Sequence, residues 1–192
     1  MMKHFIFFFL IIISCSKAES QQLKPIGVPQ SKILEVKNYI KGKDFNQELA
    51  VFINFRISSG KYRYFVYNLK KNTIVQQAVV SHGSGSVIPR SDALRFSNTE
   101  GSYQSSLGKY VIGESYIGKF GKAYRLKGLD STNSNAMQRA VVLHSYGCIP
   151  DVESETPACL SLGCPMLSVN AFKETSRYID QSVNPMILYA FY

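Results

Sequence analysis

The chain has 192 residues, 45% of them hydrophobic, and a formal net charge of +9 from 22 lysines and arginines against 13 acidic residues. This length and hydrophobic content suit one globular domain and argue against a wholly disordered chain. The positive charge favours anionic partners such as cell-wall polymers or acidic lipids. The sequence contains no basic helix of the kind that binds nucleic acid, so we expect no nucleic-acid partner.

A targeting segment is predicted at residues 1–14, where a short basic start precedes an unbroken apolar run from Phe5 to Ile13. The run is too short for a bilayer span of roughly 20 residues but suits a signal peptide. The residues around Cys15 resemble a bacterial lipobox, so we expect cleavage to leave Cys15 as a lipidated N-terminus. The alternative is an ordinary secretory signal that is cut slightly later. Ser16, in place of an aspartate, favours the outer membrane by the same resemblance.

Residues 15–30 are polar and contain two prolines and a glycine, which predicts a tether between this anchor and a domain at residues 31–192. Apolar residues recur at helical spacing from Ser31 to Lys41. They predict a short amphipathic helix with Ser31 as its N-cap.

The pattern after residue 49 is typical of β-structure. Glycines and aromatic residues interleave between residues 96 and 129, where the tyrosines either line a groove for a glycopeptide or fill a β core. The fold class is therefore mainly β with two short flanking helices. The clearest strands are at residues 50–55, 63–69, 73–80 and 186–192, with a hairpin turn at 70–72 and a second helix at 169–181.

Once Cys15 carries lipid, the remaining cysteines are odd in number: Cys148, Cys159 and Cys164. In an oxidising compartment this predicts one disulfide and one free thiol. Cys148 and Cys159 bracket a polar, acidic loop whose closure would fix the approach to Cys164. We therefore favour a Cys148–Cys159 disulfide.

Cys164 lies between Gly163 and a proline, and His144 and Ser145 end an apolar run. A thiol needs a base within hydrogen-bond reach to become a nucleophile near neutral pH, and His144 can supply one. The glycine allows a turn in which the Gly163 and Cys164 N–H groups form an oxyanion hole. A buried structural histidine with an inert thiol is the plain alternative. A zinc site from His144 and three cysteines lacks a paired C-x-x-C spacing, so we predict no metal.

Several ordered motifs between residues 64 and 192 resemble the L,D-transpeptidases, cysteine enzymes of bacterial cell-wall assembly, and in particular the divergent murein L,D-transpeptidase catalytic domain branch. Two positions depart from the main family, since Leu162 replaces its histidine before the Gly-Cys pair and Met166 replaces its arginine. The matching segments are HGSGS (82–86), FSN (96–98), GSY (101–103), SSLG (105–108), YRL (124–126), GLD (128–130), RAVV (139–142) and SLGCP (161–165).

The resemblance implies a β-rich mixed sandwich and a thioester between Cys164 and a peptidoglycan stem peptide. D-alanine then leaves, and an amine acceptor takes the acyl group to form a 3→3 cross-link. His144 is base and acid, and Ser145 orients it through its carbonyl. The candidate substrate-binding residues are His82, Gly83, Tyr103, Arg125, Arg139 and Ser161.

The resemblance further implies a monomer without cofactor, attached to the membrane by its lipid in the periplasm or cell envelope. Two other functions remain open. An L,D-carboxypeptidase or hydrolase would pass the same thioester to water. A non-catalytic lipoprotein that binds the cell wall would not form the thioester at all.

Overall fold

The structure is a computed structural model that describes residue 1 and residues 27–192. The predicted signal peptide, the lipidation site Cys15 and most of the predicted tether lie outside the described residues. Among the helices of the described part, none has the length and apolar character that crossing a membrane requires.

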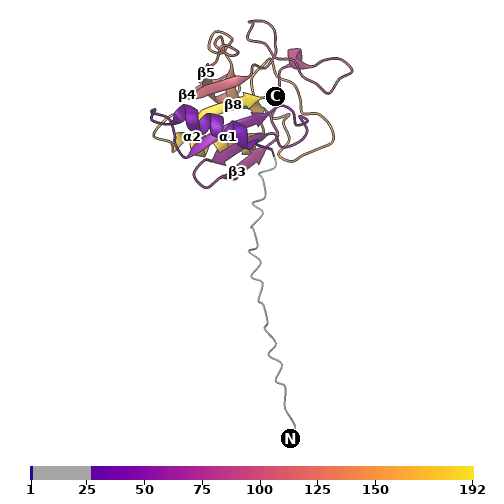
Figure 1. Ribbon diagram of the computed structural model, residues 1–192. Coiled ribbons are helices and arrows are strands. Elements are labelled where there is room, and N and C mark those ends of the chain that lie inside the picture. The colour runs from indigo at the N-terminus through magenta and orange to yellow at the C-terminus, as the bar shows by residue number, and fades with distance from the viewer. Residues whose placement is uncertain (2–26) are drawn as a thin grey trace.

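One mixed eight-stranded sheet organises the domain, with strand order β3-β2-β1-β8-β4-β5-β6-β7 (Figure 1). The β1–β8 and β6–β7 pairs are parallel, and the other neighbours are antiparallel. The strands are β1 (Leu49–Asn54), β2 (Tyr64–Asn68), β3 (Thr73–Ala78), β4 (Gly108–Gly118), β5 (Gly121–Gly128), β6 (Val142–Ser145), β7 (Met166–Leu167) and β8 (Ile187–Phe191), and the helices are α1 (Gln30–Ile40) and α2 (Val169–Asp180).

The central strand β1 is buried on both faces, which explains its unbroken apolar sequence. Ala50 and Phe52 point to the cluster under α1, whereas Val51 and Ile53 point to the larger cluster on the opposite face. This alternation follows from the two-residue period of a strand. The sheet therefore separates two hydrophobic cores.

Helix α1 covers the first of these cores, where Ile33, Val36 and Ile40 are buried. The predicted N-cap Ser31 is wrong, because the helix begins at Gln30 and the cap position is Pro29. The Pro29 carbonyl accepts the N–H groups of Lys32 and Ile33 in the first turn of the helix. The fixed φ of proline favours this earlier start.

Helix α2 borders the other core and lies beside the end of the sheet that carries β6 and β7. Its N-cap Ser168 accepts the Ala171 N–H at 3.1 Å, and Phe172 packs against Tyr124 with ring centroids 5.8 Å apart. The prediction of a mainly β domain with two short helices is confirmed, as is the β2–β3 hairpin.

Helix α1 offers a direct test of this packing. We expect Ile33→Ala to lower the free energy of unfolding by about 2–5 kcal/mol, because the side chain is fully buried and its loss leaves a cavity. Leu34→Ala on the same helix is the matched control, since Leu34 is 47% exposed and should cost no more than about 0.5 kcal/mol. Urea denaturation measures both, and equal effects would contradict the assigned face of α1.

Candidate active site

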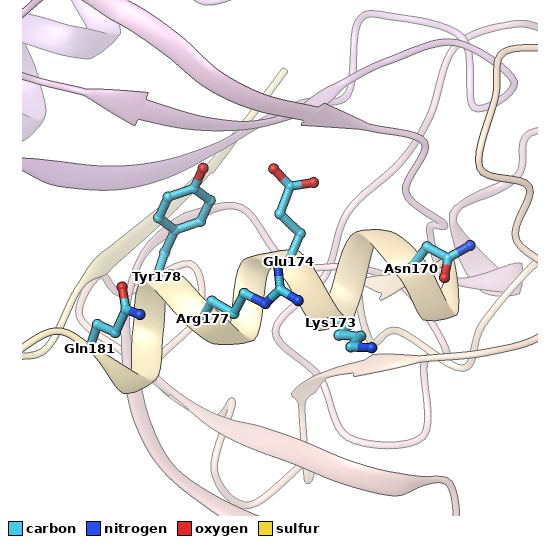
Figure 2. Close-up of a pocket in the computed structure, with 6 residues that line it drawn as sticks. All are labelled: Asn170, Lys173, Glu174, Arg177, Tyr178 and Gln181. Atoms are coloured by element: carbon cyan, nitrogen blue, oxygen red, sulfur yellow. The ribbon is translucent and has the colours of Figure 1, made fainter.

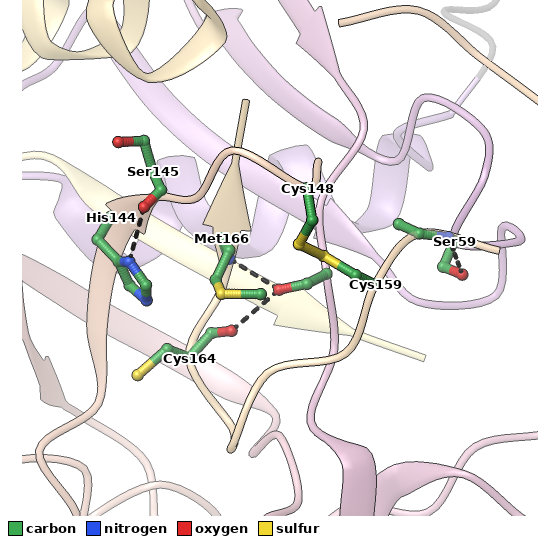
Figure 3. Close-up of a disulfide and its surroundings, with 9 residues drawn as sticks. Ser59, His144, Ser145, Cys148, Cys159, Cys164 and Met166 are labelled. Carbon is green, nitrogen blue, oxygen red and sulfur yellow. Dashed lines mark hydrogen bonds between the residues drawn. A yellow bond between two sulfur atoms is a disulfide. The ribbon is translucent and has the colours of Figure 1, made fainter. Parts of the chain in front are cut away.

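The parallel pair β6–β7 brings the predicted nucleophile and base together. His144 in β6 lies opposite Met166 in β7, and the His144 N–H donates to the Pro165 carbonyl at 3.4 Å. Two positions earlier, the Val142 N–H donates to Cys164 Sγ at 3.4 Å. Residues 142 and 144 of β6 point to the same side of the strand and lie about 7 Å apart, so the thiol and the imidazole occupy the same side of this strand pair. Figure 3 shows the imidazole on the side of the strand pair where the sulfur lies.

The orientation of His144 is set by its neighbours. Its Nδ1 lies 3.0 Å from the Ser145 carbonyl oxygen, which only accepts, so Nδ1 carries the proton and Nε2 is left as the basic atom. The Phe120 ring stacks on the imidazole with centroids 5.3 Å apart, and Tyr146 packs edge-on against Phe120. The Ser145 carbonyl therefore makes the hydrogen bond to His144 that its predicted orienting role requires.

Burial keeps both groups neutral in the resting site. It raises the pKa of the Cys164 thiol, and the Val142 N–H and the charge of Arg139 offset only part of this effect. It lowers the pKa of His144, with the Ser145 carbonyl acting in the opposite direction. The resting pair near pH 7 is a thiol and a neutral imidazole, and the thiol donates to the Ala140 carbonyl at 3.7 Å. Such a site needs proton transfer to His144 as the thiolate forms.

Gly163 is required by the backbone ahead of Cys164. Its φ is +121°, and a Cβ there would lie 3.0 Å from the Gln104 carbonyl oxygen. The Gly163 N–H donates to the buried Ser161 hydroxyl at 3.0 Å. This N–H is therefore occupied, and the Cys164 N–H is the better candidate for an oxyanion donor.

The residues after β3 form a scaffold for the nucleophile segment. The Ser161 N–H donates to the His82 carbonyl, and the Ser84 N–H donates to the Ser161 carbonyl. Ser81 Oγ donates to the Cys164 carbonyl at 3.2 Å and accepts the Met166 N–H at 2.9 Å (Figure 3). Ser81 and the HGSGS motif that follows it thus hold the segment from Ser161 to Met166 in place.

Two residues of that motif that were predicted to bind substrate, Gly83 and His82, are closely packed against other parts of the chain. A Cβ on Gly83 would lie 2.1 Å from the Tyr103 carbonyl oxygen and 3.0 Å from Gly163 Cα, so only glycine fits this contact. His82 is buried and its Nδ1 lies 2.8 Å from Arg63 Nη2. Tyr103 adopts a positive φ of 53° and exposes more than half of its side chain beside this motif.

The two predicted arginines lie in different environments. Arg139 donates to the Gln104 carbonyl at 2.5 Å and to the Ser97 carbonyl at 2.8 Å, and its Nη2 approaches the position of a Gly163 Cβ within 3.4 Å. Its charge lowers the pKa of Cys164 and so favours the thiolate. Arg125 instead lies over the Tyr116 ring at 4.6 Å, and within the described residues its guanidinium forms no hydrogen bond or ion pair.

Cys148 and Cys159 form a disulfide, and Cys164 is the free cysteine among the described residues (Figure 3). Because sulfur atoms in a disulfide are not thiolates, they cannot serve in the four-ligand zinc arrangement. The loop that the disulfide closes is anchored on both sides. The Ser154 N–H donates to the Gly60 carbonyl, and Asp151 accepts from the Ser168 hydroxyl at the start of α2.

One residue that the sequence did not single out, Phe120, stacks on His144. Phe120 lies at the tip of the β4–β5 hairpin. Because β5 pairs with β6, this tip lies beside His144, on which Phe120 stacks. Phe120 and Ser145 also line a cavity of about 480 Å³ with basic side chains on its α2 side. Leu162, 71% exposed, adds an apolar group next to Cys164.

A second depression, of about 410 Å³, follows the outer face of α2 and is lined by that helix alone (Figure 2). Its lining residues are Asn170, Lys173, Glu174, Arg177, Tyr178 and Gln181. Neither Cys164 nor His144 contributes to it. We therefore place the chemistry at the β6–β7 edge and not on this helix.

The chain matches a family model described as "L,D-transpeptidase catalytic domain" over residues 21–191. A search of curated proteins gave no match. Among solved structures, a variant of the helical cell shape determining protein Pgp2 from Campylobacter jejuni is 14% identical, with a TM-score of 0.50 over 85% of this chain and 56% of that one. An L,D-transpeptidase from Mycobacterium smegmatis is 11% identical, with a TM-score of 0.44 over 76% of this chain and 59% of that one. The chain thus spans less than two thirds of either structure.

Gly163 provides a test of the site geometry. We expect Gly163→Ala to cost about 1–3 kcal/mol in the free energy of unfolding and to slow alkylation of Cys164 by iodoacetamide, because the new Cβ strains the turn and pushes on Gln104. Gly147→Ala is the control, since a Cβ there meets nothing within 4 Å. Unchanged stability and alkylation rate in Gly163→Ala would show that the turn is not needed.

Proposed function

The chain belongs to the L,D-transpeptidase catalytic domain family, and we propose that it is a peptidoglycan L,D-transpeptidase with Cys164 as nucleophile and His144 as base. The observation that supports this most is the placement of the free thiol of Cys164 on the Val142 N–H of β6, two residues from His144, whose Nδ1 is held by the Ser145 carbonyl so that Nε2 is left as the base. Membership of this family and the buried, neutral pair agree with acyl transfer.

In the first half of the proposed reaction, His144 Nε2 takes the proton of the Cys164 thiol as the sulfur attacks the carbonyl carbon of a stem peptide. The tetrahedral intermediate collapses when the C–N bond breaks. The D-alanine amine leaves with the proton that His144 returns, and a thioester remains on Cys164. One residue is therefore base and then acid, as expected where Leu162 replaces a second histidine.

The negatively charged oxygen of the tetrahedral intermediate needs hydrogen-bond donors to stabilise it. The Cys164 N–H is proposed as one donor, because the Gly163 N–H is held by Ser161. Arg139 contributes through its charge at a fixed position, since its hydrogen bonds to two backbone carbonyls prevent it from turning away. Preorganised charge of this kind is often the largest contribution to acyl-transfer rates.

In the second half, the amine of another stem attacks the thioester carbon and passes its proton to His144. The sulfur leaves and recovers a proton, and a 3→3 cross-link is formed. Such transfer requires that the acceptor reaches the thioester before water does. The cavity of about 480 Å³ between the hairpin tip and α2 is the proposed approach for one of the stems.

We propose that the enzyme acts in the cell envelope, at the periplasmic face of a membrane. This rests on the apolar segment at residues 5–13 and on the lipobox-like residues ahead of Cys15. The Cys148–Cys159 disulfide agrees with an oxidising compartment. Lipid attachment at Cys15 and location at the outer membrane are proposed from the sequence alone.

The reaction is tested by incubating the purified protein with disaccharide-tetrapeptide and analysing the products by mass spectrometry. We expect a cross-linked dimer and free D-alanine in equal amounts. Free tripeptide without dimer would replace the transferase with an L,D-carboxypeptidase. No product at all would favour a binding protein.

The roles of the two residues are tested with a carbapenem, which acylates nucleophilic thiols of this type. We expect one covalent adduct per chain in the native protein, none in Cys164→Ala, and acylation about 10²–10⁴-fold slower in His144→Gln, because the thiol loses its base. Lys71→Gln, at an exposed position in the β2–β3 turn, is the control. An adduct on any residue other than Cys164 would contradict the assignment.

The acid limb of the acylation rate reports on His144. Protonated His144 cannot accept the thiol proton, and burial lowers its pKa from the ordinary 6.5. We therefore expect the midpoint of the acid limb to lie below pH 6.5. Stopped-flow measurement of carbapenem acylation between pH 4 and 8 checks this, and a midpoint above 6.5 would indicate a charged partner that stabilises the imidazolium.

A further inference from the structure

A cavity of about 670 Å³ opens on the other side of the nucleophile segment and has no part in the reaction described above. Its size is in the range of small-molecule sites. The floor includes Arg63 and His82, one wall is formed by Ala158 and Leu160 from the disulfide-closed loop, and the rim carries Arg56 and Asp92.

Arg63 places a positive charge under this cavity without a carboxylate to balance it. The residue is 1% exposed, and within the described residues it forms no ion pair. Its guanidinium donates to the Val80 carbonyl at 2.8 and 2.9 Å and to the Ile57 carbonyl at 3.3 Å. Burial lowers its pKa to about 9. Carbonyl oxygens satisfy the donors but leave the net charge uncompensated.

The second floor residue, His82, presents a buried donor without a partner. Arg63 Nη2 can only donate, so His82 Nδ1 at 2.8 Å must accept, and the ring proton is then on Nε2. This Nε2 is buried and has no hydrogen-bond partner. Burial and the charge of Arg63 lower the pKa of His82 to about 4, so the ring is neutral near pH 7. A buried N–H without an acceptor is unfavourable, and an acceptor that reaches it from the cavity would remove this cost.

The cavity is joined to the catalytic segment by the backbone. The His82 carbonyl accepts the Ser161 N–H at 2.9 Å, and Leu160 of the cavity wall precedes Ser161 directly. The next residue, Gly83, lies so close to the same segment that a Cβ on it would be 3.0 Å from Gly163 Cα. A ligand that occupies the cavity therefore abuts the segment that carries Cys164.

We propose that this cavity binds a carboxylate-bearing part of the peptidoglycan stem, with Arg63 supplying the charge and the His82 Nε2–H the hydrogen-bond donor. This inference rests on the proposed function and gives its substrate a binding site for an acidic group. Arg56 adds a second positive charge at the rim. Asp92 opposes it, because its carboxylate repels an anion from the same cavity.

The inference is tested by NMR, with disaccharide-tetrapeptide as the probe and Cys164→Ala as the non-reacting protein. The chain has 3 histidines, so their ring signals are readily assigned. We expect saturating probe to shift the His82 Nε2–H signal. We expect the same molecule with its carboxylates converted to carboxamides to leave that signal unchanged.

The other outcomes separate this inference from the proposed function. A shift of His144 without a shift of His82 would overturn the cavity site and leave the catalytic site intact. Absence of a His82 shift overturns the proposed cavity site whatever the His144 signal does. Acylation of native Cys164 by the carbapenem tests catalysis independently. Equal shifts with the free and amidated probes would also overturn the carboxylate specificity.

Two exposed rim positions allow variants that leave the core unchanged. We expect Arg56→Gln to weaken binding of the probe to Cys164→Ala by about 3- to 10-fold and Asp92→Asn to tighten it by a similar factor, as for single charges at a partly exposed site. Lys71→Gln, an exposed change in the β2–β3 turn, is the control and should leave the Kd unchanged. Rim variants that both match the control would contradict the proposal.

Discussion

The parallel pairing of β6 and β7 is the interaction on which the rest of the site depends. It is short, with His144 opposite Met166 and Ser145 opposite Leu167. Yet it fixes the nucleophile segment beside β6, where the Val142 N–H donates to Cys164 Sγ two residues before His144. The scaffold from Ser81 to Ser84 supports the same segment from the other side through backbone hydrogen bonds. The two flanking helices and the central strands supply the hydrophobic burial that keeps this edge of the sheet ordered.

Burial then determines the chemistry. A thiol and an imidazole in water would form an ion pair only weakly, and burial here raises the pKa of Cys164 and lowers that of His144. In the proposed reaction charge develops only as His144 takes the thiol proton, and the nearby charge of Arg139 favours the thiolate. Arg139 is held by backbone carbonyls of residues 97 and 104, so the segment with the FSN and GSY motifs serves to position a charge.

Much of this arrangement was predictable from the sequence, for identifiable reasons. The helices and the β2–β3 hairpin follow from periodicity and turn residues, and Cys164 and His144 follow from motifs that stand in a fixed order. Contacts between distant segments were not predictable. Phe120 stacks on His144 because β5 pairs with β6, and Arg63 reaches His82 because two strand ends meet. The engagement of the Gly163 N–H by Ser161 likewise depends on side-chain placement within one turn, which no spacing rule specifies.

The cavity between the hairpin tip and α2 and the cavity at Arg63 and His82 are the proposed sites for parts of the stem peptides. The central claim, however, is the covalent intermediate itself. The most direct measurement is rapid-quench intact-mass spectrometry of the native protein mixed with disaccharide-tetrapeptide, followed by peptide mapping. The account predicts a transient adduct on Cys164 with the mass of the tetrapeptide donor less D-alanine. Turnover of the donor without any adduct on Cys164 would contradict it.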